Sequence, residues 1–136
     1  MSVALLSVGL LALLVFLLGL NVSRERRSVI LTQHEAEADP KSALRKAIRA
    51  HGNCIEYVPM LSVLILAIGN RTPILPVWLA ALMLAAVAAR YLHAISIIVS
   101  DSIYQPTALK FVGAAGTYLV GALLSVVLII SAAQLF

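Results

Sequence analysis

Four long apolar segments, separated by short polar stretches, dominate the pattern of this chain. They cover about residues 3–20, 41–69, 74–99 and 108–135. Because an α-helix rises about 1.5 Å per residue, segments of this length can cross a hydrocarbon core of roughly 30 Å. The pattern therefore predicts an all-α membrane protein, a bundle of four transmembrane helices in a single domain that covers residues 1–136.

Two of the predicted helices begin with the same local signal, a polar residue followed by proline. Asp39 precedes Pro40, and Thr72 precedes Pro73. Asp and Thr are favoured at the N-cap of a helix, and proline is favoured at its first position. We therefore expect the second helix to begin near Pro40 with Asp39 as its cap, and residues 30–39 to form a polar loop.

Composition and charge agree with a membrane location. Hydrophobic residues make up 62% of the chain and charged residues 12%, whereas soluble domains have about 45–50% and about 25%. The net charge of +4 comes mainly from basic residues in the first loop and the helix start after it. This bias places the first and third loops in the cytoplasm and both termini outside. Since no Lys or Arg precedes Arg24, we expect the first segment to be retained rather than removed as a signal.

Residues that bind metals or form disulfides are few and scattered. The chain has one cysteine, Cys54, and three histidines, His34, His51 and His93. We therefore expect no disulfide and no metal site. The basic residues flank apolar spans and lie in no DNA- or RNA-binding motif, so we expect no nucleic-acid partner.

Polar side chains form a stripe along the first half of the second predicted helix. Arg45, Arg49, Asn53 and Glu56 follow one another at steps of four, four and three, which places them on one helix face. An ionisable group as far inside the helix as Glu56 is costly in a membrane, and it normally faces a wet cavity or a partner. Arg49 is the expected partner of Glu56. Alternatively, Arg45 and Arg49 are only the positive charges that orient the protein.

A second polar patch lies on the third predicted helix, where Arg90 and His93 are three residues apart. Antiparallel helices would bring this patch to the same membrane side as the first. A pocket lined by arginine, amide and carboxylate groups suits a small anion that also carries an amine. Alternatively, Arg90 extends to the membrane interface, and His93 is a hydrogen-bonded core residue.

Three stretches of the chain resemble a known family. The run "RAHGNCIEYVP", residues 49–59, is similar to the signature of the MAPEG family, membrane-associated proteins in eicosanoid and glutathione metabolism. That signature is Arg-Ala-x-x-Asn-x-x-Glu, often followed by Tyr and Pro. "ARYLHA", residues 89–94, and "LKFVGAAGTYLV", residues 109–120, are similar to other parts of bacterial-type members.

The resemblance implies a homotrimer in the bacterial inner membrane, with glutathione bound between neighbouring subunits. An arginine of the first loop belongs to the family's site, and Arg26 or Arg24 could fill this role. The glutathione-binding residues implied by the match are Arg49, Asn53, Glu56, Tyr57, His51, Arg90, His93 and Arg26.

The activity implied by the resemblance is that of a glutathione transferase or peroxidase acting on lipophilic electrophiles. A nearby cation favours the thiolate, which is the nucleophile. The family places an arginine for this purpose near the start of the last helix, where this chain has Lys110. Lysine keeps the charge but lacks the planar fork of arginine. Lys110 is thus the implied catalytic residue, while Ile97 replaces a tyrosine that some members carry.

Two other functions remain as alternatives to an enzyme. One is a non-catalytic member that binds a lipid or a thiol as an accessory protein. The other is a small four-helix multidrug exporter. Such exporters depend on an acidic residue within the first span, and residues 3–20 contain none.

Overall fold

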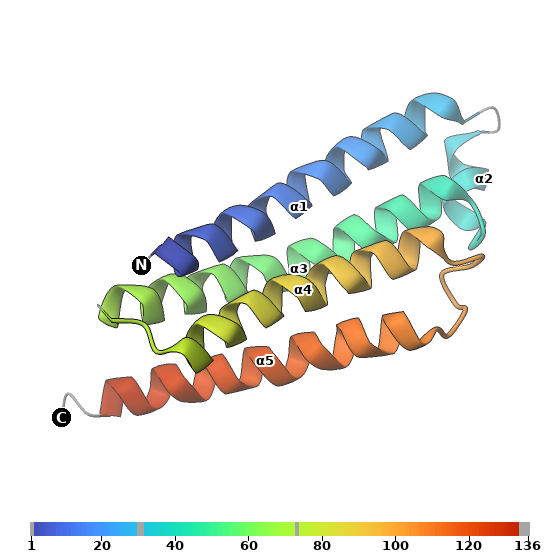
Figure 1. The fold of residues 1–136 in the computed structure, drawn as a ribbon. Coiled ribbons are helices and arrows are strands. Elements are labelled where there is room, and N and C mark those ends of the chain that lie inside the picture. Colours follow the sequence, from blue (N-terminus) through green and yellow to red (C-terminus); the bar gives the residue numbers. More distant parts are fainter. Residues whose placement is uncertain (1, 30–31, 73, 134–136) are drawn as a thin grey trace.

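Four long helices lie side by side in an up-and-down arrangement, and one additional short helix lies at one end of the bundle (Figure 1). The structure, a computed structural model, describes residues 2–29, 32–72 and 74–133. Within these ranges the helices are α1 (Ser2–Ser28), α2 (Gln33–Ala38), α3 (Ala43–Arg71), α4 (Val77–Val99) and α5 (Ala108–Ala133). The N-terminal end of α1 and the C-terminal end of α5 lie at the end opposite α2.

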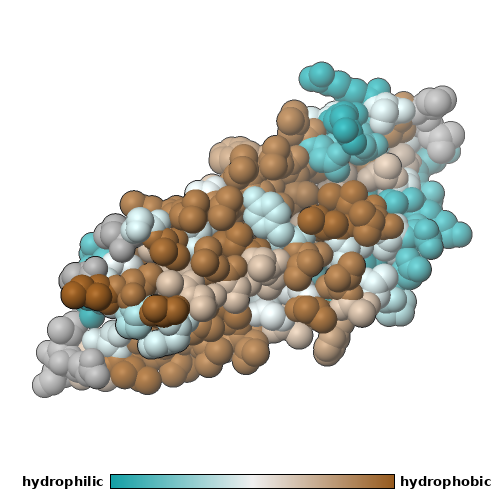
Figure 2. Space-filling view, viewed as in Figure 1, coloured by the Kyte–Doolittle hydropathy of each residue, from teal (hydrophilic) through white to brown (hydrophobic). Residues whose placement is uncertain are grey.

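The four long helices are long and apolar enough to cross a membrane. Hydrophobic residues cover their sides, and hydrophilic residues gather at the end of the bundle where α2 lies (Figure 2). The predicted all-α fold with four membrane-spanning helices is therefore confirmed. Much of the apolar surface of α5 stays uncovered in the chain, since only 22% of its most apolar stretch is buried.

The polar segment between the first two spans contains a helix that the sequence prediction missed. Thr32 and Glu35 form a capping box at the start of α2. The Thr32 hydroxyl accepts from the Glu35 backbone N–H at 3.4 Å, and the Thr32 N–H donates to the Glu35 carboxylate at 3.2 Å. Such a box pairs two backbone donors that would otherwise be unsatisfied at the helix start, which stabilises a helix of only six residues.

The predicted cap of the second long helix is wrong. Asp39 ends α2, and its carboxylate accepts from the Lys41 N–H at 2.9 Å. The N-cap of α3 is Ser42, whose hydroxyl accepts from the Arg45 N–H at 3.0 Å. The same hydroxyl donates to the Ala36 carbonyl of α2. Ser42 rather than Asp39 is the cap because its hydroxyl satisfies a backbone carbonyl at the end of α2 and a backbone N–H at the start of α3.

The third long helix also begins later than predicted. Its N-cap is Pro76, without a side-chain hydrogen bond, and the helix starts at Val77 rather than Ile74. A proline disfavours helical geometry in the residue before it, so Pro76 keeps Leu75 out of the helix. The other proline of this turn, Pro73, lies outside the described residues.

Close contact between α4 and α5 depends on a glycine. A Cβ added at Gly113 would lie 2.7 Å from the Cβ and the backbone nitrogen of His93. Gly113 and Thr117 are buried against α4 within the chain. Small residues at such crossings let helix backbones approach each other in a membrane, and this crossing brings His93 beside the start of α5.

Gly113→Ala is expected to lower the free energy of unfolding by about 1–3 kcal/mol, because the added methyl group overpacks the α4–α5 contact. Thermal unfolding of the purified protein in mild detergent measures the effect. Gly9→Ala is the matched control, since a Cβ at Gly9 would have nothing within 4 Å. Equal melting temperatures for the two variants would show that α4 and α5 are not packed as described.

Candidate functional site

A polar pocket lies between α3, α4 and α5, toward the end of the bundle that carries α2. Its volume is about 180 Å³. It contains five of the residues singled out in the sequence, together with three from α5. The lining residues are Arg49, Asn53, Tyr57, Arg90, His93, Ala114, Thr117 and Tyr118.

Helical spacing explains how α3 contributes to this pocket. Arg49, Asn53 and Tyr57 are four residues apart in sequence, so their side chains lie above one another on one face of the helix. That face turns toward α4 and α5. Arg49 is exposed at the outer end, whereas Asn53 and Tyr57 are partly buried.

Arg90 is the buried centre of the pocket, with 1% of its surface exposed. Its Nη2 donates to the Asn53 side-chain oxygen at 2.8 Å and to the Asn53 backbone carbonyl at 3.2 Å. Its Nη1 donates to the Thr117 hydroxyl at 3.4 Å. Within the described residues, no carboxylate lies within ion-pair distance of this guanidinium. Because an uncompensated buried charge is costly, the positive potential of Arg90 favours an anion in the pocket.

Two tyrosines, Tyr57 and Tyr118, line the pocket beside Arg90. The Arg90 guanidinium carbon lies 5.3 Å from the centre of the Tyr57 ring, within the range of a cation–π interaction. The hydroxyl oxygens of Tyr57 and Tyr118 are 3.0 Å apart, and the two rings meet edge to face with centres 5.6 Å apart. These contacts connect α3, α4 and α5 through one continuous set of side chains.

The imidazole of His93 is fixed by the start of α5. Its Nδ1 lies 3.0 Å from the backbone carbonyl of Lys110. A carbonyl oxygen can only accept, so Nδ1 carries the proton, and Nε2 is the acceptor of the neutral ring. His93 is therefore held in one tautomer at the pocket wall, with one nitrogen available as a hydrogen-bond acceptor.

Lys110 lies beside the polar pocket rather than among its lining residues. Its ammonium donates to the backbone carbonyls of Ser102, Ile103 and Gln105 at 3.0, 3.3 and 2.8 Å. An ammonium has three protons, so these three bonds use all of them. In this conformation Lys110 holds the loop between α4 and α5, and its catalytic role stays a prediction.

Glu56 does not face the polar pocket. It is exposed near the middle of α3, and the ion pairs formed by the described residues do not include one between Glu56 and Arg49. The expected pairing of Glu56 with Arg49 within the chain is wrong. Seven residues separate the two positions, which corresponds to roughly 10 Å along a helix.

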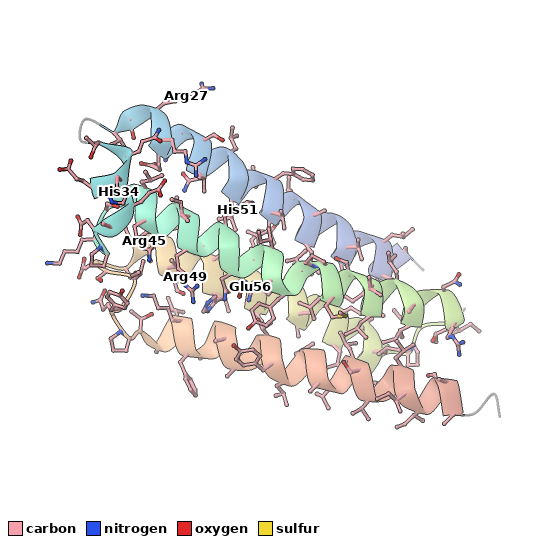
Figure 3. The ribbon with its side chains drawn as sticks, turned by 180° about the vertical axis from the view of Figure 1, so that it is seen from behind. Arg27, His34, Arg45, Arg49, His51 and Glu56 are labelled. Atoms are coloured by element: carbon pink, nitrogen blue, oxygen red, sulfur yellow. The ribbon has the colours of Figure 1, made fainter. Side chains whose placement is uncertain are left out.

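His51 and Arg26 belong to a different hollow, on the opposite side of α3. Figure 3 shows His51 on the side that faces α1, and Arg49 on the side that faces α4 and α5. The hollow between α1 and α3 has a volume of about 460 Å³. Its lining residues are Gly19, Val22, Ser23, Arg26, Ile48, His51, Gly52 and Ile55. Arg24, the alternative first-loop arginine, lies outside this hollow and is hydrogen-bonded to Glu25.

Sequence reasoning missed the contribution of α5 to the polar pocket. Neither Thr117 nor Tyr118 was predicted as a site residue. Both lie within the family-like run at residues 109–120. The sequence does contain a signal, since Thr117 and Tyr118 place two adjacent hydroxyl groups within an apolar helix. Which way these hydroxyl groups point, however, depends on how α5 packs against α3.

Comparison with known protein families matches residues 4–130 to the MAPEG family. The match covers nearly the whole chain. The chain belongs to the MAPEG family. The resemblance found in its motifs is thereby confirmed, and the chain is an integral membrane protein related to glutathione and eicosanoid metabolism. A search of curated proteins and a search of solved structures each gave no match.

Proposed function

We propose that this MAPEG protein binds glutathione between neighbouring subunits of a homotrimer and transfers its thiolate to a lipophilic electrophile. The main observation behind the proposal is that the predicted glutathione-binding residues lie in two separate hollows, on opposite sides of α3. Arg49 and Asn53 lie on one side of α3, and His51 lies with Arg26 on the other. A single ligand can touch both sets only if they come from two copies of the chain.

The exposure of Glu56 supports a second copy at this surface. Glu56 lies uncovered near the middle of a helix long enough to span a membrane. Ionisable groups at such positions normally face a bundle interior or a wet cavity. A neighbouring subunit over α3 would place Glu56 in an intersubunit cleft beside the polar pocket instead of in lipid.

The residue types fit the chemical groups of glutathione. The Arg49 guanidinium can hold a carboxylate through two hydrogen bonds, Asn53 can bond a peptide group, and Glu56 can bind the ammonium. Buried Arg90 would position Asn53 and Tyr57 and add positive potential for an anionic ligand. The bilayer would supply the lipophilic substrate from the side.

Basic residues on both sides of α2 determine the proposed orientation. The α2 end would face the cytoplasm, where glutathione is held in reduced form, and both termini would face outward in a bacterial inner membrane. Eight basic residues lie at this end: Arg24, Arg26, Arg27, Lys41, Arg45, Lys46 and Arg49 before and after α2, and Lys110 at the start of α5.

One observation favours a second function, a non-catalytic glutathione- or lipid-binding protein. The three protons of Lys110 are donated to loop carbonyls, whereas thiolate stabilisation requires this ammonium to face the thiol. Catalysis through Lys110 therefore needs the loop at residues 100–107 to release the ammonium when glutathione binds.

Replacing Lys110 with methionine separates the two functions. For an enzyme, we expect kcat for conjugation of glutathione to a hydrophobic aryl halide to fall about tenfold or more, a loss of about 1.4 kcal/mol of transition-state stabilisation. The Kd for glutathione, measured by titration calorimetry, should change less than about twofold. Lys46→Met is the control, since Lys46 also donates to this loop, at the Ser100 carbonyl. Tight binding without turnover in the wild-type protein would establish the non-catalytic function.

A further inference from the structure

The loop between α4 and α5, residues 100–107, turns backbone carbonyls toward positive charges at the end of the bundle that carries α2 (Figure 1). The Lys110 ammonium donates to three of these carbonyls, at distances between 2.8 and 3.3 Å. The Lys46 ammonium, from α3, donates to a fourth at 3.0 Å. The accepting carbonyls belong to Ser100, Ser102, Ile103 and Gln105. One short loop thus holds two cations, from two different helices, through uncharged oxygens.

Hydrogen bonds within and around the loop fix the direction of these carbonyls. A trans peptide unit is planar, and its C=O and N–H groups point in opposite directions. The Ile103 N–H, in one plane with the Ser102 carbonyl, donates to the Pro40 carbonyl at 3.0 Å. The Tyr104 N–H, in one plane with the Ile103 carbonyl, donates to the Ser102 hydroxyl at 3.3 Å. Two of the three carbonyls around Lys110 would therefore keep their direction if the ammonium moved away.

The carbonyls of Ser102, Ile103 and Gln105 form a carbonyl cage around the Lys110 ammonium. These three residues are partly buried, and an acceptor that loses its donor without gaining another partner is costly. The thiolate chemistry proposed above requires Lys110 to leave the cage and face the polar pocket. Its departure therefore needs another positive charge to take its place in the cage.

The cage fits a single positive charge of about the size of an ammonium group. Its distances of 2.8–3.3 Å are longer than the roughly 2.3–2.6 Å of Ca²⁺ sites and the roughly 2.0–2.1 Å of Mg²⁺ sites. Its three oxygens carry no formal charge, and the nearby Lys46 ammonium disfavours a doubly charged ion. Rings of backbone carbonyls replace the hydration shell of K⁺ in selective channels. Asp101, the one charged residue within the loop, adds negative potential for a cation.

We propose that the carbonyl cage is a binding site for a monovalent cation of the size of potassium, which replaces the Lys110 ammonium there. The cation keeps the loop in place and frees Lys110 for the polar pocket. Its effect on catalysis rests on the function proposed above, but its binding does not. Lys110 and the cation occupy the cage in turn, so each weakens the hold of the other.

Equilibrium binding of radioactive rubidium, a substitute for potassium, tests the site in detergent-purified protein. Lys110→Met removes the competing ammonium, so this variant should bind rubidium saturably and about tenfold more tightly than the wild type. Potassium should displace the label, whereas the much larger N-methylglucamine cation should not. Lys41→Met is the matched control. It removes one positive charge at the same end of the bundle, but the loop carbonyls accept from Lys46 and Lys110, so its rubidium binding should equal that of the wild type.

Thermal unfolding shows whether the cation replaces the ammonium in holding the loop. Lys110→Met should melt below the wild type in N-methylglucamine chloride, because three carbonyls have lost their donor. Potassium chloride of equal ionic strength, at about ten times the Kd, should raise the melting temperature of this variant by about 4 °C. The wild type should respond less, since its own ammonium fills the cage. Folded Lys110→Met protein with no rubidium binding and equal melting temperatures in both salts would overturn the cation site.

The wild-type protein supplies a measurement that depends on no variant. Replacing N-methylglucamine with potassium at constant ionic strength should raise kcat for glutathione conjugation about tenfold, because more Lys110 leaves the cage. The Kd for glutathione should change less than about twofold, and the kcat of Lys110→Met should not respond to potassium. A wild-type kcat that is the same in both salts would contradict the release of Lys110 by the cation.

Glutathione titration of the same samples keeps the cation site separate from the proposed function. Saturable rubidium binding to Lys110→Met, together with no glutathione binding to the wild type, would overturn the proposed function and leave the cation site standing. Glutathione binding and turnover, together with no rubidium binding and no response to potassium, would overturn the cation site alone.

Discussion

Arg90→Met is expected to weaken glutathione binding about 30-fold or more, equivalent to about 2 kcal/mol. Methionine fills much of the same buried space, but it removes the donors that hold Asn53 and Thr117. The Asn53 side chain loses its 2.8 Å charge-assisted bond, and Tyr57 loses the cation against its ring. The pocket also loses the positive potential that favours an anion.

Titration calorimetry on detergent-purified protein measures this effect, with thermal unfolding recorded for each sample. Arg71→Met is the matched control, because Arg71 ends α3 away from the polar pocket and has only a long 3.5 Å bond to the Ser131 carbonyl. Arg90→Lys should restore only part of the affinity, since lysine lacks the planar fork. If Arg90→Met bound glutathione like the wild type while keeping its melting temperature, Arg90 would have no part in the site.

Arg49→Ala and Glu56→Gln are each expected to weaken glutathione binding about tenfold or more, a loss of about 1.4 kcal/mol. Both side chains are exposed in the subunit, so their replacement should leave the melting temperature unchanged. Arg27→Ala, at the exposed end of α1, is the control for loss of a surface charge. Wild-type affinity in both variants would place the glutathione site elsewhere.

The same experiment extends to the other side of α3. His51→Ala and Arg26→Ala should also weaken binding, although neither residue lines the pocket that contains Arg49. Within one subunit these effects would have no common cause. A ligand that spans two subunits explains them, because it would touch the α3–α4–α5 pocket of one copy and the α1–α3 hollow of the next.

The fold was largely predictable because its main determinant is the length of apolar segments. A membrane-spanning helix must satisfy its backbone hydrogen bonds internally, so four long apolar runs leave little choice of structure. The errors lie at helix starts, where several residues compete for the same backbone groups. Ser42 rather than Asp39 caps α3, and α4 begins at Val77 rather than at Ile74.

The site was predictable where it depends on one helix and not where it depends on packing. The spacing of Arg49 and Asn53 predicts a shared face of α3 without any knowledge of its neighbours. The predicted stripe also included Arg45 and Glu56, which do not line the pocket. The position of Tyr118 follows only from the α3–α5 contact. The separation of His51 from Asn53 is a matter of helical phase, since two residues differ by about 200° around the axis.

The central claim is that two subunits share each glutathione site, and a mixed oligomer tests it most directly. Arg49→Ala chains and His51→Ala chains, each with a different affinity tag, are co-expressed and purified through both tags. In a cyclic trimer, every mixed assembly has about one boundary in three with both halves intact. Titration calorimetry should then show wild-type affinity at about one third of the sites, whereas either variant alone binds weakly. Binding in the mixed oligomer that stays as weak as in the separate variants would contradict a shared site.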